Sequence, residues 1–285
     1  MAESVCCIVC GASSATPLFS QVPDYFLPTG IRVDYARCNA CGLVQQIPLP
    51  TDVGPFYAGY PVHARKAWLH EVMRRVVMRP VYYDLATLNK DQVLLDYGCG
   101  DGWFLRDAAP HVSAAYGFEP TAAQSEDVSR RVSTTVFHDL AAMQAVLAGR
   151  VDVVTMHFVM EHLTDLRGTL RVISGLLKPG GVLRAVVPNL ENVEFRWFGS
   201  RWHGFDAPRH ICFPNPQQLA PILEEVGLSL QRDGYVPFPN TMAASLCIAL
   251  TGRYRPMPFL FFLPLALIWA RLYPRGNRAF VLQKL

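Results

Sequence analysis

The feature that most constrains the fold is a short apolar run that leads into a glycine-rich loop. Residues 93–97 (VLLDY) are apolar apart from one acid, and three glycines follow at alternate positions: Gly98, Gly100 and Gly102. Such a run predicts a buried strand, and glycines allow the backbone to approach a ligand closely because they carry no β-carbon. The dinucleotide fingerprint is G-x-G-x-x-G, and its third glycine would fall on Trp103. The loop therefore predicts a ligand site that disfavours nicotinamide nucleotides.

The chain beyond this loop alternates between short β-branched runs and helical stretches. Further strands are expected at 114–119, 134–137, 151–157, 182–187, 228–236 and 278–285. Helices are expected between them at 104–109, 121–132, 140–148 and 215–227, with one more that ends at Leu177. Lys178-Pro-Gly-Gly181 is expected to turn the chain from that helix into the next strand. This alternation predicts an α/β fold with a doubly wound, mostly parallel seven-stranded sheet and right-handed crossovers.

Three segments lie outside this alternation. Residues 1–55 hold paired cysteines and many turn formers, which is typical of a small module held together by a ligand. The α/β domain is then expected to span residues 56–285, with a helix over 64–88 leading into it. Residues 237–277 form a long apolar insertion of helical character before the last strand.

Four cysteines of the N-terminal module form two Cys-x-x-Cys pairs: Cys7, Cys10, Cys38 and Cys41. Four thiolates suit a closed tetrahedral Zn²⁺ site of structural type, because no position is left open for a substrate. Cys6 is adjacent to Cys7 and could replace it, and free buried thiols are the alternative to metal binding. Because the module and the α/β domain are expected to have separate cores, removal of the metal is expected to leave the larger domain folded.

Glu119 ends the second expected strand, 21 positions after Gly98. A carboxylate at the carboxyl edge of a parallel sheet can accept hydrogen bonds from both hydroxyls of a ribose. The alternative is that Glu119 caps the helix that starts after Pro120. The combination of strand, glycine loop and acid favours the cofactor role.

Four segments in this order resemble the class I S-adenosylmethionine (SAM)-dependent methyltransferases. They are D-x-G-x-G-x-G at 96–102, the acid Glu119, DVVTMHFVMEHL at 152–163 and LKPGG at 177–181. The resemblance covers roughly residues 90–235 and implies SAM as the cofactor. In that family the first-strand acid and the glycine loop surround the methionine part, the second acid holds the ribose, and a polar residue after the third strand meets the adenine amine. The implied cofactor-binding residues are Asp96, Gly98, Gly100, Gly102, Glu119, Asp139, His157 and Phe158.

The N-terminal module points to a particular group within this family. With the following Gln45-Gln-Ile-Pro-Leu-Pro50, it is similar to the zinc-ribbon module that precedes the methyltransferase domain in bacterial enzymes of sugar, polysaccharide and secondary-metabolite pathways. This implies a small-molecule or glycan acceptor, with a sugar hydroxyl or carbon as the methylated atom.

Methyl transfer to a hydroxyl requires a base that removes its proton. Residues 200–213 (SRWHGFDAPRHICF) follow the fifth strand and are dense in His, Arg and aromatic residues, where the carboxyl edge of the sheet opens. His210 and His203 are the candidate catalytic bases, and the alternative is that His210 only fixes the loop by hydrogen bonding. Glu161 and His162 have the same two possible roles, and their position at a helix start favours local capping and packing over a catalytic role.

Charge and motifs argue against a nucleic-acid partner. The formal net charge is only +3, and residues 1–55 contain Arg32 and Arg37 as their basic residues, so no basic stripe is predicted. Base N-methyltransferases often carry Asn/Asp-Pro-Pro-aromatic after the fourth strand, where this chain has His157-Phe-Val-Met. A zinc-ribbon nucleic-acid-binding protein or RNA methyltransferase remains the first alternative, and a non-catalytic SAM-binding module is the second.

The apolar insertion raises the question of a membrane. The chain is 51% hydrophobic and its start lacks the pattern of a secretory signal, so a cytoplasmic protein is expected. Residues 256–272 are apolar but short, and Pro258 and Pro264 interrupt them, which disfavours a spanning helix. Every charged residue after Asp233 is basic: Arg253, Arg255, Arg271, Arg275, Arg278 and Lys284. Two hypotheses stay open: peripheral contact with the inner face of a membrane, which would suit a lipid-linked acceptor, or a buried interface such as a homodimer.

Overall fold

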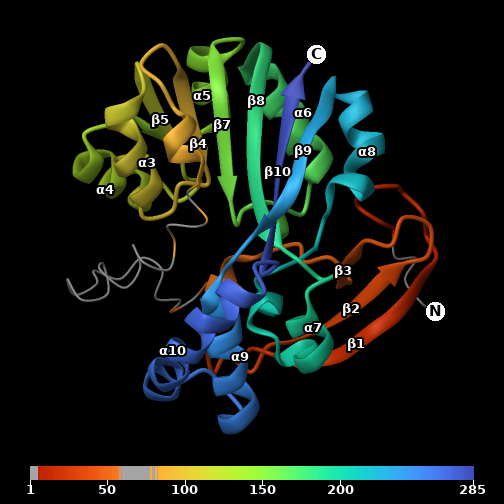
Figure 1. The fold of residues 1–285 in the computed structure, drawn as a ribbon. Helices are drawn as coiled ribbons and strands as arrows, with labels where there is room; N and C mark the ends of the chain where they lie inside the picture. The colour runs from red at the N-terminus through yellow and green to blue at the C-terminus, as the bar shows by residue number, and fades with distance from the viewer. Residues whose placement is uncertain (1–5, 58, 60–77, 79–80, 82) are drawn as a thin grey trace.

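The computed structural model describes residues 6–57, 59, 78, 81 and 83–285. Its centre is a seven-stranded sheet with the strand order β6-β5-β4-β7-β8-β10-β9 (Figure 1). The strands are β4 (Val93–Tyr97), β5 (Ala114–Phe118), β6 (Val136–Phe137), β7 (Val151–His157), β8 (Leu177–Pro188), β9 (Leu228–Val236) and β10 (Asn277–Lys284). The five neighbouring strands β6, β5, β4, β7 and β8 run parallel to one another. Strand β10 pairs antiparallel with both β8 and β9. The predicted mostly parallel, seven-stranded sheet is confirmed.

Helices cover both faces of this sheet. Successive strand residues point to opposite faces, so the side chains on both faces are buried beneath helices. On β4, Leu94 packs with Phe104 on one face, whereas Leu95 belongs to the apolar cluster on the other face. The helices that follow the parallel strands are α3 (Trp103–Ala108), α4 (Ala122–Val132), α5 (Leu140–Leu147) and α6 (Leu166–Leu176), with α8 (Pro216–Glu225) before β9. Alternate strand residues are buried on both faces, as a doubly wound fold requires.

The Lys178–Gly181 segment differs from the expected turn. It lies inside β8, where Val151 pairs with Leu177 and Val153 already pairs with Val182, so the four residues bulge out of the ladder. The Lys178 ammonium lies 2.8 Å from the Asp152 carboxylate on β7, and this pair holds the bulge against the neighbouring strand. The expected tight reversal is therefore a strand bulge.

The N-terminal module is an antiparallel sheet of β1 (Ala15–Pro23), β2 (Arg32–Cys38) and β3 (Val44–Ile47), followed by the short helix α1 (Gly54–Tyr57). Gln45 forms an isolated antiparallel bridge with Cys212, and the Tyr35 hydroxyl donates to the His210 carbonyl oxygen at 2.8 Å. Val9 and Leu43 belong to the same apolar cluster as the core of the large sheet. The expectation of separate cores is therefore wrong, because apolar side chains of the module fill the edge of the larger core.

The expected helix over 64–88 lies mostly outside the described residues. Within them, Tyr83–Thr87 forms the 3₁₀ turn η2. Other short turns are η3 (Ala109–His111), η4 (Met160–His162), η5 (Gly199–Arg201) and η6 (His203–Phe205), and α7 (Val193–Phe198) follows β8.

The apolar insertion forms two packed helices, α9 (Pro239–Thr251) and α10 (Pro256–Leu272), before the chain returns as β10. Figure 1 shows this pair and the N-terminal module beyond the edge of the sheet at which β7 ends. Among the described helices, none has both the length and the apolar character that a bilayer crossing needs.

Candidate functional site

The three glycines of the loop after β4 serve two different purposes. All have positive φ, at 75° for Gly98, 50° for Gly100 and 72° for Gly102, so an L side chain would be strained at each. A β-carbon at Gly98 would lie 2.7 Å from Val159 Cγ2, and one at Gly102 would lie 2.4 Å from Val128 Cγ1. A β-carbon at Gly100 would meet nothing within 4 Å. Gly98 and Gly102 are therefore required by internal packing, whereas Gly100 faces open space that a ligand can fill.

Two buried acids lie beside this loop. Asp96 on β4 is 3% exposed and accepts a hydrogen bond from Thr155 Oγ1 at 2.8 Å. Glu119 follows β5 and is 8% exposed, with one carboxylate oxygen 3.3 Å from the Thr121 amide nitrogen. The Glu119 contact with the following turn is long, so the carboxylate retains capacity to accept hydrogen bonds from a bound molecule.

The arrangement fits SAM. Open space at Gly100 would admit a ligand against the backbone, the buried Asp96 would suit a positively charged group, and Glu119 could accept hydrogen bonds from ribose hydroxyls. When bound, SAM supplies a methyl group on a positively charged sulfur.

The remaining cofactor candidates have other contacts in the structure. Asp139 is exposed and caps α5, where its carboxylate accepts from the Ala142 amide at 2.7 Å. The His157 ring lies edge-on to Phe104, with 4.6 Å between centroids. Phe158 has φ of 58° and packs 5.2 Å from the ring of Phe238. Their roles at the cofactor stay predictions, and Asp139 has the helix cap as a sufficient structural role.

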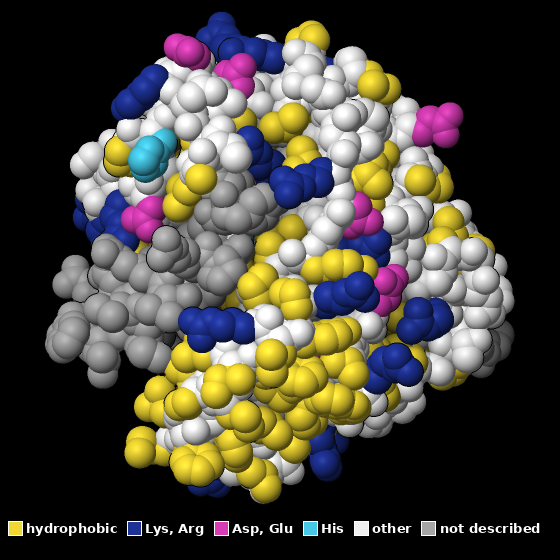
Figure 2. All heavy atoms as spheres, viewed as in Figure 1, with side chains coloured by type: hydrophobic (Ala, Val, Ile, Leu, Met, Phe, Trp, Pro, Cys, Tyr) yellow, Lys and Arg dark blue, Asp and Glu magenta, His cyan; other side chains and the backbone are white. Residues whose placement is uncertain are grey.

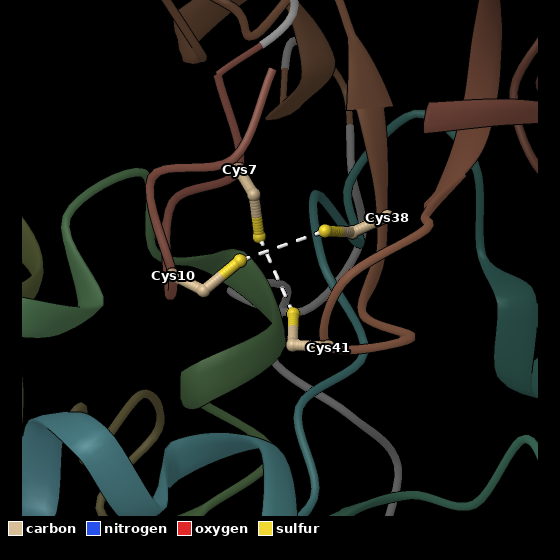
Figure 3. Close-up of side chains that lie close together, drawn as sticks. All are labelled: Cys7, Cys10, Cys38 and Cys41. Carbon is tan, nitrogen blue, oxygen red and sulfur yellow. Dashed lines mark hydrogen bonds between the residues drawn. The ribbon is translucent and has the colours of Figure 1, made fainter. Parts of the chain in front are cut away.

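The four predicted metal ligands converge, as Figure 3 shows. The Sγ atoms of Cys7 and Cys41 are 3.6 Å apart, those of Cys10 and Cys38 are also 3.6 Å apart, and all four lie within 4.8 Å of one another. Zn–S bonds of about 2.3 Å in a tetrahedron give sulfur separations of roughly 3.8 Å, so the cluster has the dimensions of a zinc site. Cys6 is exposed and its thiol faces the Gly11 carbonyl at 3.3 Å, so Cys7 is the member of the cluster.

A buried ion network joins the N-terminal module to the 202–213 loop. The Arg209 side chain is fully buried, and its guanidinium lies 2.8 Å from the Asp24 carboxylate and 2.8 Å from the Asp206 carboxylate. Burial alone would raise the pKa of Asp206, but the neighbouring Arg209 charge outweighs it and lowers that pKa to about 2. Arg209 therefore binds two acidic side chains, Asp24 and Asp206, that lie far apart in the sequence.

The next residue, His210, faces a buried carboxylate. Its Nδ1 lies 2.9 Å from the Gly204 carbonyl oxygen, which can only accept, so Nδ1 carries the proton and Nε2 keeps a lone pair. Nε2 lies 3.9 Å from Glu161 Oε1 and 4.0 Å from Asp206 Oδ2. Burial, together with the nearby His162, lowers the pKa of His210 to about 3. The imidazole is therefore a neutral group with an available acceptor nitrogen.

Glu161 does not have the capping role expected from the sequence. It is fully buried, and among the described residues neither carboxylate oxygen has a hydrogen-bond partner. Burial raises the pKa of Glu161 to about 8. The sequence favoured capping because Glu-His at the start of a turn suits that role; the signal for a functional role was an acid in an otherwise apolar stretch.

The two other histidines differ from His210. His162 Nδ1 lies 2.9 Å from the Tyr57 hydroxyl and 3.0 Å from the Arg209 carbonyl oxygen, so it is held in place by both. The His203 ring lies against Phe26 at 5.1 Å, and its backbone N–H donates to Ser245 Oγ on α9 at 2.9 Å. The structure thus brings His210 beside Glu161 and ties His203 to the helical insertion.

Comparisons with known proteins agree with this geometry. The family model described as "Methyltransferase domain" matches residues 66–232, which is more than half of the chain. No curated protein matches the sequence.

Several solved structures share the fold. A chain of the complex between the Haloferax volcanii Trm112 methyltransferase activator and a methyltransferase aligns with TM-score 0.56 and 15% identity, over 80% of this chain and 95% of that one. The YcgJ protein from Bacillus subtilis aligns with TM-score 0.51 and 16% identity, over 72% and 97%. Geranyl diphosphate methyltransferase in complex with SAM aligns with TM-score 0.51 and 16% identity, over 83% and 92%.

The family match covers the glycine loop, both buried acids and the bulged strand β8, and the solved structures share the fold. The chain therefore belongs to the methyltransferase domain family and is a class I SAM-dependent methyltransferase.

Proposed function

We propose that the enzyme methylates a hydroxyl group of a small-molecule or glycan acceptor, with His210 as the group that takes the hydroxyl proton and Glu161 as the carboxylate that assists it. The observation that carries this proposal is the pair itself: a neutral imidazole nitrogen 3.9 Å from a fully buried carboxylate without a hydrogen-bond partner. Groups with shifted pKa values that face each other near a ligand site are typical of acid–base catalysis.

The chemistry assigned to these residues is short. The acceptor oxygen attacks the methyl carbon in line with the carbon–sulfur bond, which breaks as the new carbon–oxygen bond forms. The hydroxyl proton passes to His210 Nε2, and the Glu161 carboxylate stabilises the imidazolium that results. Asp96, Glu119 and the glycine loop hold the cofactor in this proposal, and His203 remains a second candidate base on the same loop.

The experiment for the proposed function is a transfer assay with SAM labelled in the methyl group. Purified enzyme is incubated with free sugars, nucleotide sugars and lipid-linked sugars, and products are analysed by NMR for O-methyl or C-methyl groups. An O-methylated product supports the proposal. Methylation of carbon or nitrogen alone would contradict it.

The nucleic-acid alternative gains no support from the described part of the module. The Arg32 guanidinium donates to the Gln21 carbonyl oxygen at 3.1 Å, and the Arg37 guanidinium donates to the Gly42 carbonyl oxygen at 3.1 Å. Both basic side chains therefore bind the module's own backbone. RNA in the transfer assay tests this alternative directly.

SAM affinity should depend strongly on Glu119. Glu119→Ala is expected to weaken SAM binding by about ten- to hundredfold, because hydrogen bonds to a charged group contribute roughly 1.5–3 kcal/mol. Isothermal titration calorimetry measures the change, and Glu126→Ala, an exposed acid on α4, is the control that should bind as wild type does. Equal affinity of Glu119→Ala and the control would remove Glu119 from the site. A wild-type chain that binds no SAM would contradict the cofactor assignment itself.

Residues 1–55 are proposed as a zinc module, and the shared core predicts a large effect of the metal. Elemental analysis is expected to find one zinc per chain, and Cys10→Ser is expected to lose it and to lower the urea midpoint of unfolding, because zinc binding is coupled to folding. Cys6→Ser is the matched control and should keep both the zinc and the wild-type urea midpoint. Absence of zinc, or iron with visible colour, would refute the assignment. Metal that survives in Cys10→Ser would indicate another ligand set, and in the described residues only Glu161, His162 and His210 form one.

A further inference from the structure

One face of α10 is apolar and exposed to solvent. Its residues follow a helical spacing of three or four, and Met257, Phe261 and Leu272 are each more than three-quarters exposed. The opposite face, with Leu263 and Ala266, is buried against α9. The full exposed set is Met257, Leu260, Phe261, Leu265, Ile268 and Leu272, with Leu250 on α9. We call this set the α10 face, and Figure 2 shows the hydrophobic patch to which it belongs.

Cations lie at both ends of the α10 face. Arg253 and Arg255 precede α10 and Arg271 and Arg275 lie at its other end, and all four are exposed. The chain contains no Asp or Glu after residue 233. Arg278 and Lys284 do not belong to this rim: Arg278 binds Asp233 at 2.6 Å, and the Lys284 ammonium donates to the Ser174 carbonyl oxygen at 2.7 Å. Fewer cations border the α10 face than the sequence suggests, four and not six, and they are concentrated at the two ends of the helix.

We propose that the α10 face docks on the surface of an anionic lipid bilayer. A helix of 17 residues is about 25 Å long, which is shorter than the hydrocarbon core of about 30 Å, so it lies in the interface and does not span it. Its apolar side chains enter the boundary between headgroups and acyl chains, and the four arginines bind lipid phosphates. The polar side that an isolated interfacial helix would need is supplied here by the body of the protein.

Charge favours the bilayer over a second copy of the chain. In a two-fold pairing the same patch meets itself, so the arginines at the ends of α10 would face arginines of the partner without an acid between them. Like charges opposed across an interface are destabilising. An anionic lipid surface provides the opposite charge at both ends at once.

Aromatic residues at the border of the patch support the same partner. Trp197 on α7 is 58% exposed and packs 5.2 Å from Trp269 on α10. Tryptophan is enriched at membrane–water interfaces because its ring is apolar and its N–H is polar. The Trp269 and Trp202 indoles both donate to Glu194, at 2.9 and 3.2 Å, so α10 is tied to the loop that carries His203 and His210. Docking therefore fixes that loop relative to the bilayer.

The proposal is independent of methyl transfer and is tested by sedimentation with vesicles. The full-length protein is mixed with phosphatidylcholine vesicles that contain either no or about 30% phosphatidylglycerol. Wild type is expected to sediment with the anionic vesicles at 0.1 M salt and to be largely released at 0.5 M salt, because screening shortens the range of the attraction. Equal binding to both vesicle types, or no binding, would overturn the proposal.

Two sets of variants separate the apolar and the charged parts. Phe261→Glu with Leu265→Glu should abolish vesicle binding, whereas Val146→Glu, an exposed apolar residue on α5, should leave it unchanged. Arg271→Gln with Arg275→Gln should weaken binding roughly 25-fold, since each cation contributes about fivefold. Phe261 and Leu265 are each more than half exposed, and Phe261 packs edge-on against its neighbour Phe262, so circular dichroism should show folded variants. A stable dimer that Phe261→Glu dissociates, in a protein that ignores vesicles, would place a second copy on this face instead.

Discussion

Glu161→Gln should lower the rate of methyl transfer by about two to four orders of magnitude while leaving SAM affinity within about twofold. Positioned proton transfer contributes a factor of this size, and glutamine keeps the shape of the side chain without its charge. Glu161 lies in the turn η4 after β7 and has no part in the cofactor contacts proposed for Asp96 and Glu119. The rate is measured with an acceptor found in the transfer assay, and the affinity by calorimetry.

The pH profile gives a readout that a merely structural role would not change. With the pKa of Glu161 raised to about 8 by burial, the wild-type rate should rise with pH and level off above about pH 8, where the carboxylate becomes ionised. Glu161→Gln should lose this rise. His111→Gln, an exposed histidine on η3, is the control that keeps it. A Glu161→Gln variant with the wild-type rate and profile would exclude the pair from proton transfer.

The same groups make opposite contributions to stability. The folded-state pKa of Glu161 is raised from 4.5 to about 8, so its stabilising contribution is present below pH 4.5 and is lost as pH rises through 8. The pKa of His210 is lowered from 6.5 to about 3, so its contribution is present above pH 6.5 and is lost as pH falls. Urea unfolding at pH 5, 7 and 9 should therefore show Glu161→Gln gaining on wild type towards pH 9. Asp206 acts on both groups, His162 and Arg209 act on His210, and all three remain in the variant.

Arg209→Ala is expected to reduce the free energy of unfolding by about 3–5 kcal/mol. The reason is that removal of one partner leaves buried charges without compensation, here the carboxylates of Asp24 and Asp206. Arg131→Ala provides the comparison within the same chain. Its salt bridge to Asp127 is 41% and 44% exposed on the two sides, and such surface pairs contribute about 0.2–1 kcal/mol.

Urea denaturation of both arginine variants measures the difference. The Arg209 variant should also lose methyl transfer beyond what its folded fraction explains, because the 202–213 loop is released from the N-terminal module. Losses of equal size in the two variants would mean that the Arg209 network is no stronger than a surface pair.

The large sheet could be predicted because its signals are local. Leu94 and Leu95 are both apolar because both faces of β4 are covered, and the glycines at 98 and 102 are required where Val159 and Val128 approach the backbone. The cysteine pairs were equally visible, since metal-ligand spacing is a property of neighbouring residues. The apolar run, the glycine spacing and the cysteine spacing can each be recognised without knowing which distant residues they contact.

The rest depends on contacts between residues far apart in the sequence. Arg209 and Asp24 are 185 positions apart, and no periodicity indicates that they meet. The local sequence around Glu161 favoured a cap. Its isolation from hydrogen-bond donors arises only when the distant 202–213 loop folds over it. The apolar residues of the N-terminal module resembled those of an independent unit, and only the packing of Val9 and Leu43 shows a common core.

The helical insertion begins and ends at one rung of the sheet, since Val236 on β9 pairs directly with Asn277 on β10. In the topology of the sheet, α9 and α10 thus form the connection between two adjacent antiparallel strands, where a β-hairpin has a short turn. We therefore expect changes in the length of α9 and α10 to leave the register of these two strands unchanged. Under the lipid-docking proposal, remodelling this one connection would alter the docking surface, while the strands that lead into the glycine loop and towards Glu161 keep their sequence.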